Sequence, residues 1–554
     1  MLLPRFVSRV ATVLSLGVAV LICAPDAYAQ FGLPANVNLG IGTPPAVISG
    51  VATGDLDNDG RGDIVGVDSA NPGNIGLALG IGGGLYSVQT VVPGGALGSP
   101  TGLATPQLAD FDNDGFLDLA ASGTNSTGTD TAVFIYQGVP GAGTYTFVLQ
   151  QILPVAPLPG EVTGLRTTDF TNDGLQEFLA TNDSSLAVNQ LVGLRRNLGG
   201  FVFGPMVSQS TATGASDIDI CVDFNGDQLK DLVICRPISA FGPAGVDLYA
   251  GVGTPFQPQF PFIPPTPTIS LQMPPGFSPK DVHFIECDFQ NGYDLVIGVD
   301  GPIPGIFVLR NLGPPNFFAS AALLTPFIST GVPVSVLRAE STFDGVEDLL
   351  VYGLNPSGPV LKSATFDLFE MKNCIPTLVS ATQAGAADTT AANQEKLAPQ
   401  AVGDQQFDGQ RELLVVDHST PGGSTINVYT NNTPTEFTIS PDQPTLGQVT
   451  PIRFKIEIPN HAGSPFFLLF STAGPTPGTP IGGGLVLPLN LPLFPVVFQG
   501  TLSAAGDGSF GTPAVTFPSA PVTFSLQMAG AVVVMSSAGA GPVHVTNPAT
   551  ITLP

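Results

Sequence analysis

Short apolar runs separated by polar turns make up most of the chain. In one stretch an acidic loop leads into the β-branched run "DIVGV" at residues 63–67, and the apolar runs "NIGLALGIGGG" and "LYSVQTVV" follow. Runs of this length between glycine and proline turns are typical of β-strands. Together with the apolar stretch before the acidic loop, they predict a unit of four short strands. No long stretch shows the periodicity of an amphipathic helix, so the pattern predicts an all-β protein.

This unit recurs along the sequence. Its acidic loops, numbered loop 1 to loop 7 in chain order, begin at residues 55, 110, 169, 223, 288, 340 and 404, so that successive loops lie 52–65 residues apart. Seven repeats of this length, each with four strands, are typical of a β-propeller in which every repeat forms one blade. The sequence therefore predicts a seven-bladed propeller over residues 30–434.

The last repeat lacks a fourth strand. Its third strand, at residues 424–431, runs directly into a segment of different composition. The segment "FGLPANVNLG" at residues 31–40 precedes the first repeat and has the pattern of an isolated strand. We predict that it completes the seventh blade, because a closed ring leaves no exposed edge strand.

The repeats resemble the FG-GAP/VCBS family, which is best known from the propellers of integrin α subunits. The matching motif is D-x-D-x-D-G-x-x-D followed by an apolar strand, as in "GDLDNDGRGDIVGV" at residues 54–67 and "ADFDNDGFLDLAA" at residues 109–121. The resemblance covers residues 31–434 and implies the propeller fold. The family includes adhesins, lectins and modules attached to enzymes, so the resemblance leaves these functions open.

The acidic loops predict calcium sites. Four carboxylates within nine residues repel one another unless a cation lies between them. Calcium takes about six to eight oxygen ligands, which alternating side chains and a backbone carbonyl can supply. A plain turn rich in Asp and Gly does not explain this density of charge. The most complete loops offer Asp55, Asp57, Asp59, Asp63 and the Arg61 carbonyl; Asp110, Asp112, Asp114, Asp118 and the Phe116 carbonyl; and Asp223, Asn225, Asp227, Asp231 and the Leu229 carbonyl.

The other loops keep less of this set. Loops 3 and 7 leave a calcium site and a plain turn both open, and they offer Asp169, Asp173 and Glu177 with Thr171 at the third position, and Asp404, Gln406, Asp408 and Glu412. Loop 5 runs from Asp288 to Asp294 and is two residues too short to wrap a cation in the same way. Loop 6 begins at Glu340 and is predicted to be a plain turn. The sequence thus predicts three strong calcium sites and up to five in total.

Loop 1 also contains the tripeptide Arg61-Gly62-Asp63, which is a cell-adhesion motif when it is displayed on a surface. A carboxylate that binds calcium is not available to a receptor. We therefore interpret the tripeptide as part of the calcium loop.

The N-terminus predicts export. Arg5 and Arg9 precede the apolar run "VATVLSLGVAVLICA", and "AYA" follows, which is typical of a secretory signal cleaved after Ala29. We expect a soluble protein that is secreted, periplasmic or held at the cell surface, with no membrane-spanning segment.

The cysteines leave alternatives open. A disulfide and two buried thiols are both compatible with Cys221 and Cys235, which flank a predicted hairpin. The redox state of Cys287 and Cys374 is open too.

Residues 435–554 follow a different pattern, in which alternating runs such as "IRFKIEI" and "PFFLLF" stand between Gly/Pro-rich turns. About seven strands in this segment predict a β-sandwich domain, to which the sequence assigns no function.

Composition narrows the function. Asp and Glu outnumber Lys and Arg by 43 to 17, which argues against nucleic acid as a partner because phosphate binding needs clustered basic side chains. The sequence contains no HExxH, GxSxG or CxxC motif, and its four histidines are far apart. It has no tryptophan and eight tyrosines, few for the aromatic platforms that stack on sugars.

We therefore expect a secreted, monomeric, calcium-binding propeller that is not an enzyme and that binds an extracellular protein or glycan, or serves in adhesion or surface structure. The alternative is a carbohydrate-active protein, either a lectin or a polysaccharide lyase.

Overall fold

The structure is a computed structural model of the chain. It describes residues 35–41, 48–59, 61–69, 73–82, 84–91, 100–124, 131–155, 161–171, 173–183, 190–211, 217–221, 224–225, 227, 229–236, 243–254, 257–258, 267–285, 287, 293–314, 317–318, 327–329, 332–339, 348–354, 363–372, 374–386, 400–403, 412–417, 425–430, 437–440, 449–450, 453–457, 465–471, 479–482, 485–487, 493–501, 507–511, 515–516, 526–535, 542–545 and 549–553. The predicted signal peptide, residues 1–29, lies outside the described residues. No helix in the described residues is long and apolar enough to cross a membrane.

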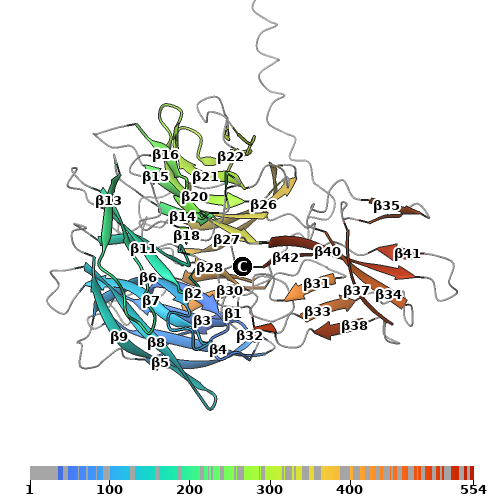
Figure 1. The fold of residues 1–554 in the computed structure, drawn as a ribbon, viewed down its shortest axis with the longest axis horizontal. Coiled ribbons are helices and arrows are strands. Elements are labelled where there is room, and N and C mark those ends of the chain that lie inside the picture. Colours follow the sequence, from blue (N-terminus) through green and yellow to red (C-terminus); the bar gives the residue numbers. More distant parts are fainter. Residues whose placement is uncertain are drawn as a thin grey trace, which may run out of the picture.

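The fold is an all-β propeller (Figure 1). Among the described residues, seven four-stranded antiparallel sheets follow one another along the chain, which equals the number of sequence repeats. Their strands are β2 (Ile48–Gly54), β3 (Asp63–Asp68), β4 (Ile75–Gly82) and β5 (Leu85–Val91) in sheet 1; β6 (Thr101–Ala109), β7 (Asp118–Thr124), β8 (Thr131–Gly141) and β9 (Thr144–Pro154) in sheet 2; β10 (Glu161–Thr168), β11 (Glu177–Asp183), β12 (Gln190–Arg195) and β13 (Val207–Thr211) in sheet 3; β14 (Asp217–Cys221), β15 (Asp231–Arg236), β16 (Gly245–Tyr249) and β19 (Ile269–Gln272) in sheet 4; β20 (Ser278–Ile285), β21 (Asp294–Asp300), β22 (Gly305–Leu309) and β23 (Phe327–Ile328) in sheet 5; β24 (Val332–Ala339), β25 (Asp348–Leu354), β26 (Ser363–Lys372) and β27 (Ile375–Ala386) in sheet 6; and β28 (Gln400–Gly403), β29 (Glu412–Asp417), β30 (Thr425–Tyr429) and β1 (Ala35–Asn38) in sheet 7. The short strands β17 (Gly253–Thr254) and β18 (Gln257–Pro258) pair with each other.

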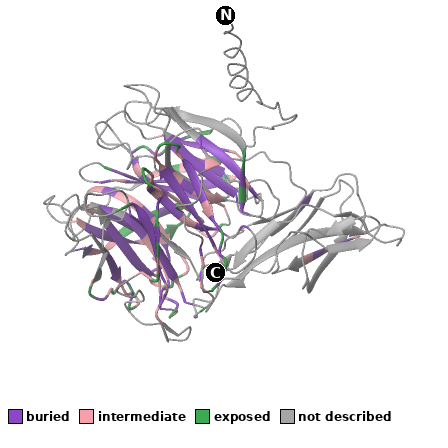
Figure 2. Cartoon of the chain, turned by 90° about the horizontal axis from the view of Figure 1, so that it is seen from above, coloured by how far each residue is buried: buried purple, intermediate pink, exposed green. Residues whose placement is uncertain are grey.

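The core lies between adjacent sheets. Every residue of β3, β15 and β16 is buried, because the inner strands pack against a neighbouring sheet on both faces. The outer strand β9 instead begins with alternating exposed and buried residues. Val65 of sheet 1 and Phe134 of sheet 2 belong to one buried cluster, which fills the space between these sheets. Figure 2 shows that the buried residues follow the strands of the sheets.

The N-terminal strand closes the ring, as the sequence predicts. Strand β1 pairs with β30 in antiparallel register, with Val37 opposite Ile426. Val37, Leu39 and Ile41 are buried in a cluster that also contains Leu414 of sheet 7 and Ile64 of sheet 1. The two ends of the propeller sequence are thus joined by both a hydrogen-bonded ladder and a shared core.

The fourth strand of sheet 3 differs from the sequence prediction. The aromatic run "FVFGPMVS" at residues 201–208 predicts a strand, but β13 begins at Val207. Phe203 forms an isolated bridge with Asn197 instead. The turn between them contains Gly199 and Gly200, both with positive φ. Phe203 packs against the core between sheets 2 and 3, which explains its aromatic character without a strand.

The segment after residue 434 is also built of strands. Its strands in the described residues are β31 (Phe437–Ser440), β32 (Val449–Thr450), β33 (Arg453–Glu457), β34 (Pro465–Ser471), β35 (Thr479–Gly482), β36 (Leu485–Leu487), β37 (Leu493–Thr501), β38 (Asp507–Gly511), β39 (Val515–Thr516), β40 (Leu526–Met535), β41 (Pro542–Val545) and β42 (Ala549–Leu553). They form antiparallel sheets, the largest with five strands. In Figure 1 they lie together to one side of the seven sheets. These are more strands than the expected seven or so, because several are only two to four residues long. The domain boundaries and the β-sandwich remain predictions.

Candidate metal centres in the acidic loops

Loops 1 to 4 connect the first and second strands of their sheets and share one backbone arrangement. In each loop a side-chain oxygen accepts the N–H two residues further on. The four examples are Asp59 with Arg61 at 2.9 Å, Asp114 with Phe116 at 2.9 Å, Asp173 with Leu175 at 3.1 Å and Asp227 with Leu229 at 2.9 Å. Such turns are a local preference of Asp and Asn, so the sequence of each loop favours its own curvature.

The last carboxylate of each loop is buried and has two backbone donors. Asp63 accepts the N–H of Leu56 at 2.7 Å and the N–H of Gly80, from the third strand, at 2.8 Å. Asp118 accepts the N–H groups of Phe111 and Gly138 in the same way, each at 2.8 Å. Both backbone donors to Glu177 of loop 3 come from the loop itself. In loops 1 and 2, by contrast, the last carboxylate ties the loop to the third strand of its sheet. The same arrangement in loop 5, at Asp294, shows that the position has a structural role as well.

Three of the loops bring carboxylate oxygens together. One oxygen from each member of a group lies within 4.8 Å of the others, and the groups are Asp55, Asp57 and Asp63 in loop 1; Asp110, Asp112 and Asp118 in loop 2; and Asp169, Asp173 and Glu177 in loop 3. The predicted ligands Asp59 and Asp114 are exposed and lie outside these groups.

Several of the predicted calcium ligands remain predictions. Asp223 of loop 4 lies outside the described residues, as do Asp404, Gln406 and Asp408 of loop 7. The described members of loop 4 are Asn225, Asp227, Leu229 and Asp231. The carbonyls of Arg61, Phe116 and Leu229 remain predicted ligands.

Burial makes these carboxylates poor anions when no cation is bound. It is the largest cause that raises the pKa of Asp63 and of Asp118 to about 8, and the neighbouring carboxylates of each loop raise it further. Burial likewise raises the pKa of Asp110 to about 6. The backbone donors act in the opposite direction but do not offset the loss of water. A divalent cation among these oxygens would restore the ionised form, so the groups in loops 1 and 2 fit calcium.

The pKa values predict an unusual pH dependence for the calcium-free protein. Because the folded-state pKa of Asp63 and Asp118 lies above the ordinary value, folding favours their protonated forms. Their contribution to stability is present below the ordinary pKa and is lost as the pH rises through about 8.

In chelator, the melting temperature should therefore fall by about 5 °C or more between pH 5.5 and pH 8.5. Saturating calcium should reduce this fall, because the cation replaces the protons. Scanning calorimetry across this range checks the prediction, and a melting temperature that rises with pH in chelator would contradict it.

The loops differ in how the protein itself compensates their charge. In loop 2 the contact to Asp112 is the neutral amide of Gln137, at 3.0 Å, and the described residues place no lysine or arginine in an ion pair with Asp110, Asp112 or Asp118. In loop 1 the partly exposed Arg61 forms an ion pair with Asp59 at 2.5 Å, and its charge also acts on Asp57. The negative charge of loop 2 is therefore the least compensated by basic side chains, and a bound cation is expected to stabilise this loop most.

Loop 3 carries its own cations. Arg196 forms an ion pair with Asp173 at 2.8 Å. Lys230, from loop 4, donates to the hydroxyl of Thr168 at 2.7 Å. Burial lowers the pKa of Lys230, and the nearby charges of Asp169 and Glu177 act in the opposite direction without offsetting it. Thr171 donates to Glu177 at 3.1 Å. The ion pair of Arg196 supplies positive charge to loop 3, which favours the plain structural interpretation, although burial still raises the pKa of Glu177 to about 8, as it does for Asp63 and Asp118.

Part of the sequence matches a known protein family. Residues 55–121 match the FG-GAP-like repeat family. The matched FG-GAP-like repeat begins at loop 1 and ends in β7, so it contains both loops that fit calcium best. No curated protein matches the chain.

Solved structures give low similarity. One is the crystal structure of BBS1N in complex with ARL6DN, soaked with lead, with a TM-score of 0.41 and 10% identity over 73% of this chain and 97% of that one. The S. cerevisiae core factor has a TM-score of 0.40 and 10% identity over 73% of this chain and 62% of that one. The Photorhabdus luminescens Tc holotoxin pore has a TM-score of 0.31 and 15% identity over 72% of this chain, which spans 18% of the length of that chain.

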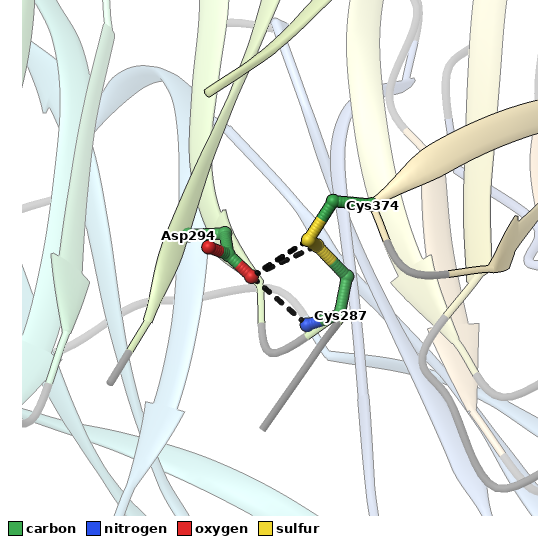
Figure 3. A group of neighbouring side chains, drawn as sticks. All are labelled: Cys287, Asp294 and Cys374. Carbon is green, nitrogen blue, oxygen red and sulfur yellow. Dashed lines mark hydrogen bonds between the residues drawn. A yellow bond between two sulfur atoms is a disulfide. The ribbon is translucent and has the colours of Figure 1, made fainter. Parts of the chain in front are cut away.

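Beyond the matched FG-GAP-like repeat, loop 5 has a disulfide-bonded cysteine where loops 1 to 4 have a hydrophobic residue (Figure 3). Cys287 and Cys374 are bonded, with their Cα atoms 5.0 Å apart, and both are buried. Asp294 accepts the N–H of Cys287 at 3.2 Å. Disulfide sulfurs are not thiolates, so this group of two cysteines and an aspartate is no metal site while the bond is intact. The bond links loop 5 to the turn between β26 and β27 of sheet 6.

The other cysteine alternative is now decided. Cys235 is buried and forms no disulfide, so a disulfide with Cys221 is wrong. Cys235 lies opposite Asp217 and Cys221 lies opposite Asp231, which puts the two cysteines at opposite ends of the ladder.

The tripeptide in loop 1 is not displayed. Asp63 is 1% exposed and its carboxylate oxygens accept backbone N–H groups. A receptor cannot reach this carboxylate in the folded protein.

Two features of the site are not predicted from the sequence, although each has a recognisable pattern in it. The tetrapeptide "RNLG" recurs at residues 196–199 and 310–313. The side-chain amides of its buried asparagines, Asn197 and Asn311, each donate to two backbone carbonyls, at 2.8–3.2 Å. One carbonyl belongs to the acidic loop of the preceding repeat and the other to the acidic loop of the asparagine's own repeat. Lys230 is a basic residue within loop 4, and the loop before it, loop 3, has an incomplete acidic set.

Proposed function

We propose that this propeller is a calcium-binding protein that acts outside the cell as a binding or surface-structural scaffold and has no enzymatic activity. The observation that carries the proposal is the group Asp110, Asp112 and Asp118, in which Asp110 and Asp118 are buried and which the described cations of the protein do not compensate. Calcium would be held there, and by Asp55, Asp57 and Asp63 in loop 1. Its role would be to hold the loops in shape, since the ligands are also the residues that fix each loop to its sheet.

The extracellular location follows from the predicted secretory signal. Free calcium is abundant outside cells, which suits sites that stabilise a fold. We propose an extracellular protein or glycan as the partner, because the acidic composition disfavours nucleic acid.

Isothermal titration calorimetry with calcium tests the proposal. Wild-type protein should bind at least two ions, and Asp57→Asn and Asp112→Asn should each remove one. Asp173→Asn is the matched control, because the charge of loop 3 is compensated by Arg196 and Lys230. Binding that is absent from wild type, or equal in wild type and Asp112→Asn, would refute the proposal.

A further inference from the structure

The acidic loops are joined to one another by asparagine side chains. Asn58 of loop 1 donates from its side-chain amide to the carbonyl of Gly115 in loop 2, at 2.8 Å. Asn113 of loop 2 donates in the same way to the carbonyl of Gly174 in loop 3, at 3.2 Å. Both asparagines occupy the fourth position of their loop and both glycines the sixth, so the bridge is a repeated feature.

The backbone at these positions suits the bridge. Asn58 and Asn113 have φ values of 58° and 63°, in the left-handed region that Asn tolerates better than most residues. Gly115 and Gly174 have φ values of 90° and 84°, where a side chain would be strained.

Each bridged glycine is also bound to a predicted calcium ligand. The N–H of Gly115 donates to Asp110 at 2.9 Å, and the N–H of Gly174 donates to Asp169 at 2.8 Å. Asn113 adds its own N–H to Asp110 at 2.7 Å. A continuous series of hydrogen bonds therefore runs from Asp169 in loop 3, through Asp110 in loop 2, to Asn58 in loop 1.

We infer that Asn58 and Asn113 are positioning residues that couple the acidic loops, so that calcium bound in loop 2 raises the calcium affinity of loop 1. The inference rests on the proposed calcium binding. A cation in loop 2 fixes Asp110 and, through it, the Gly115 peptide. The Gly115 carbonyl then fixes Asn58, whose neighbours on either side are Asp57 and Asp59. Loop 3, which holds its own cations, provides a fixed end of the series. Coupling between binding sites is reciprocal, so calcium in loop 1 equally favours binding in loop 2.

Hydrogen exchange measured by mass spectrometry during a calcium titration tests this coupling, because peptides resolve the loops. The readout is the calcium concentration at half-maximal protection of the peptide that contains loop 1. Asp112→Asn, which impairs loop 2, should raise this concentration about five-fold. In an Asn58→Gly background, Asp112→Asn should leave it unchanged. Glycine at position 58 can keep the left-handed backbone and lacks the side-chain amide. The effect of Asp112→Asn is compared within each background, so any direct effect of Asn58→Gly on loop 1 cancels.

Asn113→Gly is the matched control, because it breaks the bridge between loops 2 and 3 and leaves Asn58 in place. The effect of Asp112→Asn on loop 1 should persist in that background. Unchanged exchange in β20 and β21 confirms that each variant is folded. The inference is overturned if Asp112→Asn leaves loop 1 unaffected, or shifts it equally with and without Asn58. If loop 1 and loop 2 of the wild type show no response to calcium, both the inference and the proposed calcium binding fail.

Discussion

Removal of calcium is expected to lower the melting temperature of the protein by about 10 °C or more. A ligand at one hundred times its dissociation constant stabilises the folded state by about 2.7 kcal/mol per site. Two sites would thus contribute about 5 kcal/mol, and each kcal/mol shifts the melting temperature of a large domain by about 2–4 °C. The effect should be large because the buried carboxylates of Asp63, Asp110 and Asp118 are left close to other carboxylates of their loops.

Limited proteolysis with and without chelator locates the effect. Sheets 1 and 2 should become sensitive to cleavage when calcium is removed, and Asp57→Asn and Asp112→Asn should each abolish about half of the shift in melting temperature. Asp173→Asn should leave the shift unchanged, because the described contacts of loop 3 include Arg196 and Lys230. Equal melting in calcium and in chelator would be inconsistent with metal-dependent loops.

Deletion of residues 35–41 is expected to destabilise the propeller strongly and to cause aggregation. The deletion removes β1, which leaves the ladder of β30 without its partner. It also removes Val37, Leu39 and Ile41 from the core between sheets 7 and 1. Burial of each such side chain contributes about 1.5–3 kcal/mol, so the loss amounts to about 5–9 kcal/mol before the exposed edge is considered.

The single substitution Val37→Ala is the matched control, since it keeps the ladder and should cost only about 2 kcal/mol. Size-exclusion chromatography and calorimetry distinguish the two variants. A deletion variant that remains monomeric and melts like the wild type would show that the closing strand is dispensable.

The features that repeat along the chain are those that the sequence predicts. The spacing of the acidic loops predicts the seven sheets, and the missing fourth strand of the last repeat predicts the position of β1. Three carboxylates of loop 1 and three of loop 2 converge, because each loop is a local structure of nine residues, but Asp59 and Asp114 lie outside these groups.

Contacts between repeats could not be predicted in the same way. Cys287 and Cys374 are 87 residues apart and meet across two sheets. Lys230 reaches loop 3 from loop 4, and Asn58 reaches Gly115 across 57 residues. These pairs depend on how one sheet packs on the next, which the pattern within a single repeat does not contain. Such contacts determine how the charge of loop 3 is compensated and how neighbouring loops touch one another.

We propose loops 1 and 2 as calcium sites. Crystals grown with a lanthanide in place of calcium test this proposal most directly, because the anomalous scattering of the ion locates it without reference to any assumed ligand. We predict one peak among the carboxylates of Asp55, Asp57 and Asp63 and a second among those of Asp110, Asp112 and Asp118. A map at saturating ion with no peak in either loop would contradict this account.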